Sequence, residues 1–558
     1  MEGGARARRS ARMTAAVPAS ERTRLAWLAA YGLVNFLAFP HPLGEGVLDV
    51  GWALAWFSPA FLLLGLEGLA VARAARVGFV TVWLANAAIL HWVYVVTVVH
   101  GGAPPAIGVL SPFLLATYVG LHGAAFAAVW AWLARRGAGS PLVAAMLWVV
   151  IDHLRSFLLT GFPWAEIGYA QHENSLLMPI AAWTGVYGLA FVTVLGGAAL
   201  AGWISAWRRS LWPSRECVVI ALTIGLLHGL GSLELLEQDD GSATTVRVAA
   251  IQGSVDQGAK WSPERYVDTL ELYDRLSRKA VAQGARLVVW PETALPGAIE
   301  LDVEVADRLL ALARETRAAY VIGAVGVRQN PQTGEITDYY DSAFVLDAEG
   351  RAVDRYDKSH LVPFGEYVPF RGLLGGLLDA VARGIAPLDV SAGDGPRAVE
   401  VDLGPGVGRI RLGIPICYEL LFPDRVRRFV DDGAQLLVAI TNDAWYGRTG
   451  APHQFLAMTA LRSAETGAWT VRAANTGVSA IIDGRGRVRA ESALFEPAVL
   501  VADVPLLAAG AGARGASPYV RLGDVFVGSC WIGLLVTSVR AARRQGSADA
   551  EERGASPE

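Results

Sequence analysis

Three polar segments of the sequence each place a reactive side chain after an apolar run. They are Val288-Val-Trp-Pro-Glu292-Thr, Tyr356-Asp-Lys358-Ser-His-Leu-Val-Pro-Phe-Gly-Glu366 and Gly413-Ile-Pro-Ile-Cys417-Tyr-Glu419. A carboxylate, an amine and a thiol suffice for covalent acyl transfer. Glu292 would take the thiol proton, Cys417 would attack a carbonyl carbon, and Lys358 would stabilise the oxyanion. A thiol suits this reaction because its thiolate is accessible near neutral pH, and a nearby ammonium lowers the pKa of the thiol further.

Cys417 differs in its surroundings from the other two cysteines of the chain. Cys217 and Cys530 lie at or inside apolar stretches, so Cys417 is the one thiol of the polar region and no disulfide framework is expected. An isolated cysteine after an apolar strand is more often a buried structural thiol than a nucleophile. The catalytic interpretation therefore depends on Glu292 and Lys358 as much as on the cysteine.

The elements that must position these residues are recognisable in the same region. Short runs rich in β-branched residues predict strands at 246–251, 287–290, 320–323, 410–416 and 436–440. Between them, helical periodicity predicts helices at 264–282, 303–316 and 453–465. This alternation over residues 237–522 predicts a layered α/β domain.

The rest of the chain is too apolar for a soluble surface. Of 558 residues, 53% are hydrophobic and 18% are charged, and the mean hydropathy is +0.37, values typical of a membrane protein with an attached polar domain. Apolar runs long enough to cross a bilayer lie at 25–39, 52–71, 77–99, 107–133, 142–159, 177–207, 218–236 and 525–539. We therefore expect about eight transmembrane helices, seven in a membrane domain at 25–236 and an eighth at 523–541.

Basic residues predict the orientation of these spans. Arginines occur in the N-terminal segment, after the second, fourth and sixth spans and after the eighth, whereas the opposite loops at 41–45, 100–105 and 161–174 have neither Lys nor Arg. By the positive-inside rule, the arginine-bearing side is cytoplasmic. We expect residues 1–24 to form a basic cytoplasmic tail before a retained first span, because no cleavage site of small residues follows. Residues 237–522 would lie outside, and residues 542–558 would form a disordered cytoplasmic tail.

Charge and motif content exclude several other partners. The net charge is −4 and the polar region has no basic stretch, which argues against nucleic acid. The sequence shows no cluster with zinc-ligand spacing and no phosphate loop, so neither a metal nor a cofactor is expected, and His360 is interpreted as a packed histidine. In the fifth span, Asp152 and Arg155 are three residues apart and predict an internal ion pair that orients helices.

The chain order and local patterns of the three segments resemble the Glu-Lys-Cys catalytic set of the carbon-nitrogen hydrolase, or nitrilase, superfamily. The similar patterns are Trp-Pro-Glu292, Lys358-x-His-Leu-Val-Pro-Phe-Gly-Glu366 and Cys417-Tyr-Glu419. With the spans and the stretch Asn442-Asp-Ala-Trp445-Tyr-Gly447, the chain resembles the apolipoprotein N-acyltransferases over about residues 25–540. The resemblance implies a nitrilase-like αββα sandwich attached to the multi-span helical membrane domain.

The resemblance further implies a ping-pong acyl transfer at the periplasmic face of the inner membrane. Cys417 would take the sn-1 acyl chain of a phospholipid and pass it to the free α-amino group of the S-diacylglyceryl cysteine that begins an apolipoprotein. Supporting or substrate-binding roles are implied for five further residues, namely Glu366 and Glu419 beside the active centre, Tyr418 next to the nucleophile, and Trp261 and Trp445 at the lipid-facing pocket mouth.

Simpler structural roles are compatible with the same residues. Glu366 and Glu419 could be salt-bridge partners of Lys358 or Arg425, and the two tryptophans could be core aromatics. Two other functions also share the motifs: a membrane-tethered nitrilase-type amidase, and a receptor or scaffold with a degenerate domain. The spans favour acyl transfer over hydrolysis of small amides, and the intact trio counts against a scaffold. Loops at 364–381 and 446–452, rich in glycine and aromatic residues, are expected to act as lids.

Overall fold

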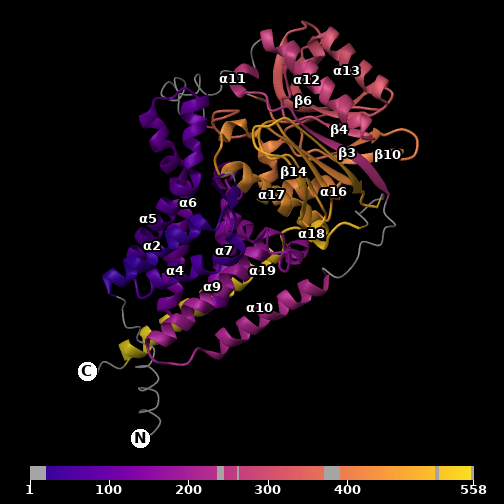
Figure 1. Cartoon of the computed structure of the whole chain (residues 1–558). Coiled ribbons are helices and arrows are strands. Elements are labelled where there is room, and N and C mark those ends of the chain that lie inside the picture. The colour runs from indigo at the N-terminus through magenta and orange to yellow at the C-terminus, as the bar shows by residue number, and fades with distance from the viewer. Residues whose placement is uncertain are drawn as a thin grey trace.

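The structure is a computed structural model that describes residues 20–44, 46–234, 244–260, 263–369, 390–508 and 515–554. Figure 1 shows a bundle of helices from the N-terminal part of the chain, in purple, beside an α/β domain in pink and orange. The last helix, in yellow, returns from the α/β domain into the bundle. The α/β domain is therefore inserted between two helices that belong to the bundle.

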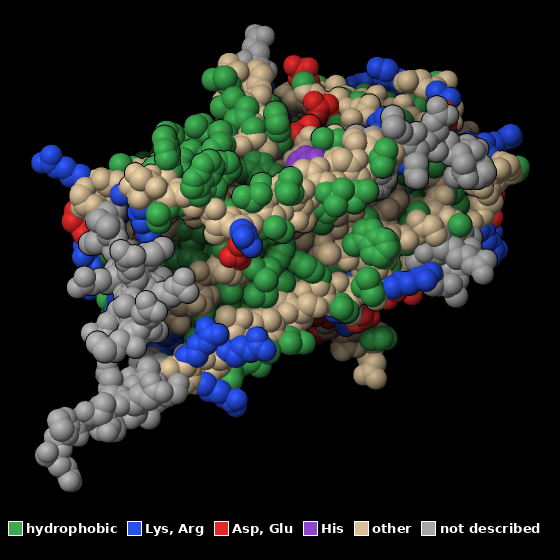
Figure 2. Space-filling view, turned by 90° about the horizontal axis from the view of Figure 1, so that it is seen from below, with side chains coloured by type: hydrophobic (Ala, Val, Ile, Leu, Met, Phe, Trp, Pro, Cys, Tyr) green, Lys and Arg blue, Asp and Glu red, His purple; other side chains and the backbone are tan. Residues whose placement is uncertain are grey.

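Five described helical stretches are long and apolar enough to cross a membrane. They are α5 (Val71–Ile89) continued by η1 (Leu90–Trp92), α6 (Pro105–Arg135), α9 (Val186–Arg208), α10 (Arg215–Glu234) and α19 (Val525–Gly554) as far as Arg544. Large apolar side chains of α10 are exposed along its length, including Leu222, Leu226 and Leu230. Seen from below, hydrophobic side chains spread over much of the molecule (Figure 2). The chain is a membrane protein.

The other three predicted spans coincide with shorter helices. α2 (Glu21–Leu37) has 17 residues and α7 (Pro141–Arg155) has 15, while α3 (Gly51–Leu54) and α4 (Phe57–Leu66) divide a single apolar run. At 1.5 Å per residue α7 is about 22 Å long, which is shorter than the roughly 30 Å of hydrocarbon in a bilayer. A total of eight spans therefore stays a prediction.

Two predicted boundaries differ from the structure. The run 177–207 is divided, because η5 (Met178–Ile180) and α8 (Ala181–Thr184) precede α9. Gly185, which separates α8 from α9, has a φ of 65°, in the left-handed region that glycine adopts without strain. The segment after residue 541, predicted to be disordered, is helical as far as Gly554, since it is rich in the helix formers alanine, arginine and glutamate.

The α/β domain contains two mixed β-sheets. Its strands are β3 (Thr245–Gln252), β4 (Leu287–Val289), β5 (Leu295–Ala298), β6 (Ala319–Gln329), β7 (Ile336–Leu346), β8 (Ala352–Asp357), β9 (Ala398–Asp402), β10 (Arg409–Gly413), β11 (Leu436–Thr441), β12 (Thr470–Ala474), β13 (Ala480–Ile482), β14 (Val488–Glu491) and β15 (Ala498–Pro505). The first sheet has the order β15-β3-β4-β6-β7-β8 with β5 beside β6, and the second has the order β14-β13-β12-β11-β10-β9. In each sheet the central strands are parallel, β3, β4 and β6 in the first and β10, β11 and β12 in the second.

The two sheets pack face to face between helices. Along β3, Val246, Val248 and Ala250 join an apolar cluster that includes the second sheet, whereas Ala249 and Ile251 join the cluster of the covering helices. The helices over the first sheet are α12 (Pro263–Ala282) and α13 (Val303–Thr316), and those over the second are α16 (Pro423–Asp431) and α17 (Ala451–Thr466). The four layers confirm the predicted αββα sandwich.

The strands and helices predicted from the sequence are all present in this domain, with bounds that differ by a few residues. The predicted strand at 410–416 ends as β10 at Gly413, because Pro415 has no N–H for the ladder, although Ile416 still pairs with Ile440. The remaining short elements are β1 (His41–Leu43), β2 (Gly46–Leu48), η2 (Val95–His100), η3 (Leu158–Thr160), η4 (Ile167–Gln171), α11 (Gln257–Lys260), η6 (Ile299–Leu301), η8 (Cys417–Leu421), η9 (Asp443–Tyr446) and α18 (Pro518–Leu522).

Candidate active site

The three predicted catalytic residues each follow a strand, and the fold brings them together. Glu292 lies three residues beyond β4, Lys358 follows β8 directly, and Cys417 lies four residues beyond β10. Cys417 is buried and begins η8 with a φ of 47°, in the left-handed region that costs a non-glycine residue about 1–2 kcal/mol. Such strain persists where the surrounding structure holds the residue in place, which is common at active sites.

Lys358 occupies the centre of a cluster of carboxyl groups. Its side chain is fully buried, and its Nζ donates hydrogen bonds to Glu292 Oε1 at 3.1 Å, Asp341 Oδ2 at 3.3 Å and Glu366 Oε1 at 2.5 Å. An ammonium has three N–H donors, so each donor has one carboxyl oxygen as its acceptor. The Lys358 ammonium is thus the positive charge of this cluster.

The electrostatics of the cluster favour a neutral thiol beside an ionised base. Burial raises the pKa of Cys417 well above its usual value, and the neighbouring Glu292 carboxylate adds to this effect. Burial would raise the pKa of Glu292 too, but the Lys358 ammonium and a hydrogen bond from Cys417 hold it below its usual value. The pKa of Lys358 is well above its usual value, since the attraction of Glu292 and Glu366 outweighs its burial. The thiol proton therefore has an acceptor at hand.

Asp341 is a member of the cluster that the sequence did not reveal. It lies within β7, its side chain is buried, and its backbone oxygen accepts the N–H of Lys358 at 2.9 Å. Burial, followed by the charge of Glu292, raises the pKa of Asp341 well above its usual value. The one available signal was a charged residue inside an apolar strand, which is unusual unless the charge has a partner.

Glu366 and Glu419 both support the centre, in different ways. Glu366 pairs with Lys358 and also accepts the Val362 N–H at 2.7 Å. Glu419 is buried, and its Oε1 accepts from Tyr356 OH at 2.8 Å, from Ser359 N at 2.9 Å and from Ser359 Oγ at 2.6 Å, while its Oε2 accepts from Ile416 N at 2.9 Å. Glu419 thus ties the residue after Lys358 to the residue before Cys417.

Replacing Glu419 by glutamine is expected to destabilise the protein by about 1–3 kcal/mol, because an amide nitrogen cannot accept and one buried donor would lose its partner. The acyl transfer that the family resemblance implies should slow as well, because the Lys358 and Cys417 segments would no longer be joined by one carboxylate. The checks are the thermal unfolding midpoint in detergent and the rate of acyl transfer. Glu300→Gln is the control for loss of a carboxylate acceptor at the surface of the same domain, because Glu300 accepts the Val327 N–H at 2.9 Å and pairs with Arg355. Equal behaviour of the two variants would contradict the positioning role of Glu419.

Tyr418 connects the Cys417 segment to the helical bundle. Its hydroxyl donates to the backbone oxygen of Gly161 at 2.9 Å, and its ring stacks on His360 with 5.6 Å between centroids. Burial, followed by the charge of Arg425, lowers the pKa of His360 to about 4, so this ring is neutral at physiological pH. The loop that contains Gly161 therefore lies directly against the residue next to Cys417.

Of the two tryptophans predicted at the pocket mouth, the structure describes Trp445. Trp445 is 38% exposed and meets His100 edge to face at 5.4 Å, where η9 contacts η2 of the bundle. Its neighbour Tyr446 is partly buried and packs against Trp92 and Trp164 with centroid distances of 4.9 and 5.6 Å. Trp261 lies outside the described residues, as do residues 370–381 of the first predicted lid.

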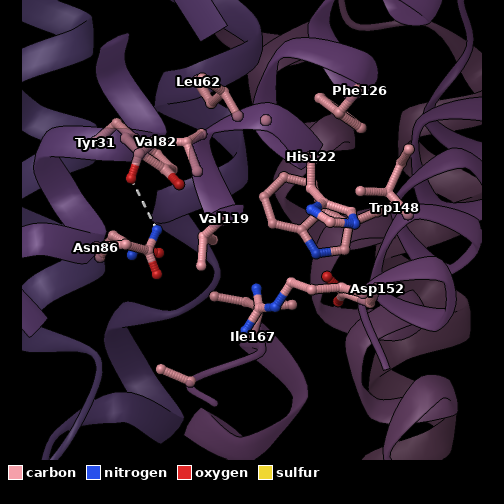
Figure 3. A pocket seen from close by; sticks show the side chains of 15 residues that line it. Tyr31, Leu62, Val82, Asn86, Val119, His122, Phe126, Trp148, Asp152 and Ile167 are labelled. Carbon is pink, nitrogen blue, oxygen red and sulfur yellow. Dashed lines mark hydrogen bonds between the residues drawn. The ribbon is translucent and has the colours of Figure 1, made fainter. Parts of the chain in front are cut away.

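A small polar cavity lies inside the bundle (Figure 3). It has a volume of about 50 Å³, and His122, Trp148 and Asp152 are among the side chains around it. Arg155 also lines this cavity, but it donates to the backbone oxygens of Phe162, at 3.0 Å, and of Trp164. The predicted ion pair of Asp152 and Arg155 is wrong for the part of the chain described, because the guanidinium holds the loop after α7 instead.

Two family models match the two parts of the chain. Residues 31–199 match the family model of the apolipoprotein N-acyltransferase N-terminal domain, and residues 247–514 match that of the carbon-nitrogen hydrolases. An amidase of the nitrilase superfamily from Nesterenkonia AN1, solved as a variant, is 20% identical, with 51% of this chain and 97% of that chain covered and a TM-score of 0.36.

Curated relatives match nearly the full length of the chain. The apolipoprotein N-acyltransferase of Geobacter metallireducens is 39% identical over 92% of this chain and 94% of that protein. That of Nitrosomonas europaea is 33% identical over 80% of this chain and 84% of that protein. The chain therefore belongs to the apolipoprotein N-acyltransferase family and is an acyltransferase of the carbon-nitrogen hydrolase superfamily.

Proposed function

We propose that this enzyme moves an acyl chain from the sn-1 position of a phospholipid, through a thioester on Cys417, to the α-amino group of the N-terminal S-diacylglyceryl cysteine of apolipoproteins. The observation that carries the proposal is the meeting of Glu292, Lys358 and Cys417 in one buried cluster that contacts the helical bundle through Tyr418. Two lipid-anchored substrates need a reaction centre that is held at the bilayer.

In the first half-reaction, Cys417 Sγ attacks the carbonyl carbon of the sn-1 ester while Glu292 takes the thiol proton. The carbonyl π electrons move to oxygen and form a tetrahedral oxyanion. When the C–O bond breaks, the leaving alkoxide takes the proton from Glu292 and departs as a lysophospholipid. The acyl group stays on sulfur as a thioester, and Glu292 is ionised again.

The positive charge of Lys358 stabilises the oxyanion. Because all three of its N–H donors have carboxyl partners, Lys358 acts mainly as a fixed charge; direct donation to the oxyanion would replace its longest contact, that to Asp341. The backbone N–H of Tyr418 supplies a second donor, since it follows the nucleophile at the start of the η8 turn.

The second half-reaction uses the same groups in reverse. The free α-amine of the diacylated apolipoprotein attacks the thioester carbonyl, and Glu292 removes a proton from the attacking nitrogen. The C–S bond then breaks, the Cys417 thiolate takes that proton back from Glu292, and the product is an amide. Amine rather than water as acceptor separates this reaction from that of an amidase.

Further parts of the proposal concern location. The arginine distribution supports a periplasmic catalytic domain in the inner membrane of a two-membrane envelope. Trp445, half exposed beside His100 of the bundle, is suited to contact lipid chains at the pocket mouth. We assign Trp261 the same role on the family resemblance.

The proposal is tested with purified protein in detergent and a phospholipid labelled in its sn-1 chain. Mass spectrometry should find a hydroxylamine-sensitive adduct on Cys417. On addition of a diacylated lipopeptide with a free N-terminus, the adduct should disappear and the label should reappear as an amide. An unlabelled Cys417 together with turnover of small amides would instead identify an amidase.

The rate of adduct formation is expected to be nearly independent of pH between about 6 and 9. The Glu292 carboxyl, with a pKa below its usual 4.5, is ionised throughout this range, and the Cys417 thiol, with a pKa well above its usual 9.0, is neutral throughout it. The rate should fall only when acid protonates Glu292, below about pH 4.5. Single-turnover labelling measures this profile. A steady rise of the rate between pH 7 and 9, as for an isolated cysteine whose thiol ionises in this range, would contradict the assignment of Glu292 as base.

A further inference from the structure

The turn that carries the nucleophile is held at its far end by groups that the reaction itself does not use. η8 begins at Cys417 and ends at Leu421. The backbone oxygen of Leu421 accepts from Tyr169 OH at 3.2 Å and from Arg462 Nη1 at 3.5 Å. Tyr169 belongs to η4 of the helical bundle, and Arg462 belongs to α17 of the sandwich. The end of the η8 turn is therefore hydrogen-bonded to both the helical bundle and the sandwich.

A buried ion pair completes this contact. Arg462 and Glu465 are 0% and 1% exposed in their side chains, and Arg462 Nη2 donates to Glu465 Oε1 at 2.9 Å and to Tyr169 OH at 3.3 Å. The same Glu465 oxygen accepts the N–H of Val186, the first residue of α9, at 2.8 Å. A carboxylate at a helix N-terminus is favourably placed against the helix dipole. Glu465 thus joins α17 directly to a candidate membrane span.

The buried ion pair by itself adds little to the stability of the fold. Removing two charges from water costs about as much as their attraction returns, and apolar residues of similar volume often serve as well. The pair instead fixes positions. Arg462 donates to the backbone oxygen of Leu421 at the end of η8, and Glu465 accepts the backbone N–H at the start of α9. Among the described residues, the side chains of Tyr169, Arg462 and Glu465 do not contact the three proposed catalytic groups, Glu292, Lys358 and the Cys417 thiol.

We propose that Tyr169, Arg462 and Glu465 form a turn clamp, three positioning residues that fix the Cys417 turn relative to the membrane-inserted helices. The clamp lets a phospholipid ester held by the bundle meet Sγ at the required distance. This proposal rests on the proposed thioester function. A displacement of about 1 Å at a reacting atom can reduce a rate by about 100-fold, so the clamp should affect the rate of acylation more than the binding of phospholipid.

The decisive variant is the double substitution Arg462→Met with Glu465→Gln. It removes both charges together, so no lone buried charge remains, and the glutamine oxygen can still accept the Val186 N–H. The expected result is an unfolding midpoint close to that of the parent, a rate of Cys417 acylation at least about tenfold lower, and an unchanged half-saturating phospholipid concentration. Parental stability with a parental acylation rate would overturn the proposal.

A second variant, Tyr169→Phe, removes only the hydroxyl. It should lower the acylation rate in the same direction, again without a change in half-saturation. Tyr320→Phe is its matched control, because Tyr320 is also a fully buried tyrosine whose hydroxyl has Thr316 as a partner at 3.0 Å, inside the sandwich. Equal losses in the two phenylalanine variants would assign Tyr169 a purely structural role and overturn the clamp.

The rate at which iodoacetamide alkylates Cys417 separates this proposal from the proposed function. If the clamp positions the turn, both clamp variants should change that rate at Cys417 relative to the parent, with Cys217 and Cys530 as internal references. A parent that forms no acyl adduct would defeat the thioester function, and the alkylation rates would still decide on the clamp. Alkylation rates identical to the parent's in both variants would overturn it.

Discussion

Replacing Cys417 by alanine is expected to abolish acyl transfer and leave the fold intact. The alanine keeps the Cβ at the strained φ of 47° and removes only the buried sulfur atom. Without a nucleophile no thioester forms, so transfer of labelled acyl chains should fall by at least about 10⁴-fold. The measurement is the yield of hydroxylamine-sensitive label on the protein, with amide product as a second readout.

The chain offers its own controls for this experiment. Cys217 and Cys530 are also buried free cysteines, and both lie on candidate membrane helices. Cys217→Ala and Cys530→Ala should keep the label and the activity. Full activity in the Cys417→Ala variant would rule out the thioester, and loss of label in either control would show that the adduct lies elsewhere.

Replacing Lys358 by methionine is expected to cost both stability and activity. Methionine is similar in length but leaves Glu292, Asp341 and Glu366 buried without their cation. Removal of one partner from a buried ion pair typically destabilises by about 3–5 kcal/mol. In addition, the carboxyls should take up protons, Glu292 would lose its function as base, and the oxyanion would lose a positive charge, so acylation should fall by about 10³-fold or more.

The stability and activity effects of this variant can be separated. Adding Asp341→Asn and Glu366→Gln to Lys358→Met removes two of the three uncompensated acids, and the unfolding midpoint should recover part of its loss. The acylation rate should not recover, because the charge on the oxyanion side is still missing. Recovery of the rate together with stability would mean that Lys358 serves the fold alone.

The sequence singled out Glu292, Lys358 and Cys417 because each of them follows an apolar strand in a polar segment, and their catalytic roles stay a prediction. Glu292 and Lys358 follow strands of the first sheet and Cys417 follows a strand of the second, so their places after strands could be inferred from the sequence, whereas the packing of the two sheets brings them together. The strand and helix pattern of the sandwich was predictable for the same reason, since burial on alternate faces leaves a periodic trace along the chain.

Residues whose role depends on contacts between the helical bundle and the sandwich could not be recognised from a sequence pattern. Arg462 and Glu465 lie three residues apart inside α17 and pair with each other, but the contact of Glu465 with Val186 of the bundle could not be inferred from neighbours in the sequence. Tyr169 is separated from Leu421 by 252 positions. Only the packing of the bundle against the sandwich makes these groups meet.

The ends of the membrane helices were equally hard to predict, because hydropathy reports apolar runs but not turns within them. The predicted span at 142–159 ends as α7 at Arg155, where the chain turns through Leu159 with a φ of 50° and Gly161 with a φ of 85°. The guanidinium of Arg155 holds that turn by its carbonyls. Arg155 thus stabilises the turn at the end of α7, whereas the sequence predicted that it would pair with Asp152.

The return of α19 to the bundle has a consequence for the timing of biosynthesis. α19 packs against α7 and α9, with Phe526 edge to face on Phe191 at 5.4 Å and Gly533 close enough to Met146 that a Cβ there would lie 2.5 Å from the sulfur. The ribosome makes the whole sandwich before it makes this helix. A nascent chain therefore carries its α/β domain before α19 exists, and the contacts of α19 with α7 and α9 form only after that domain has been made.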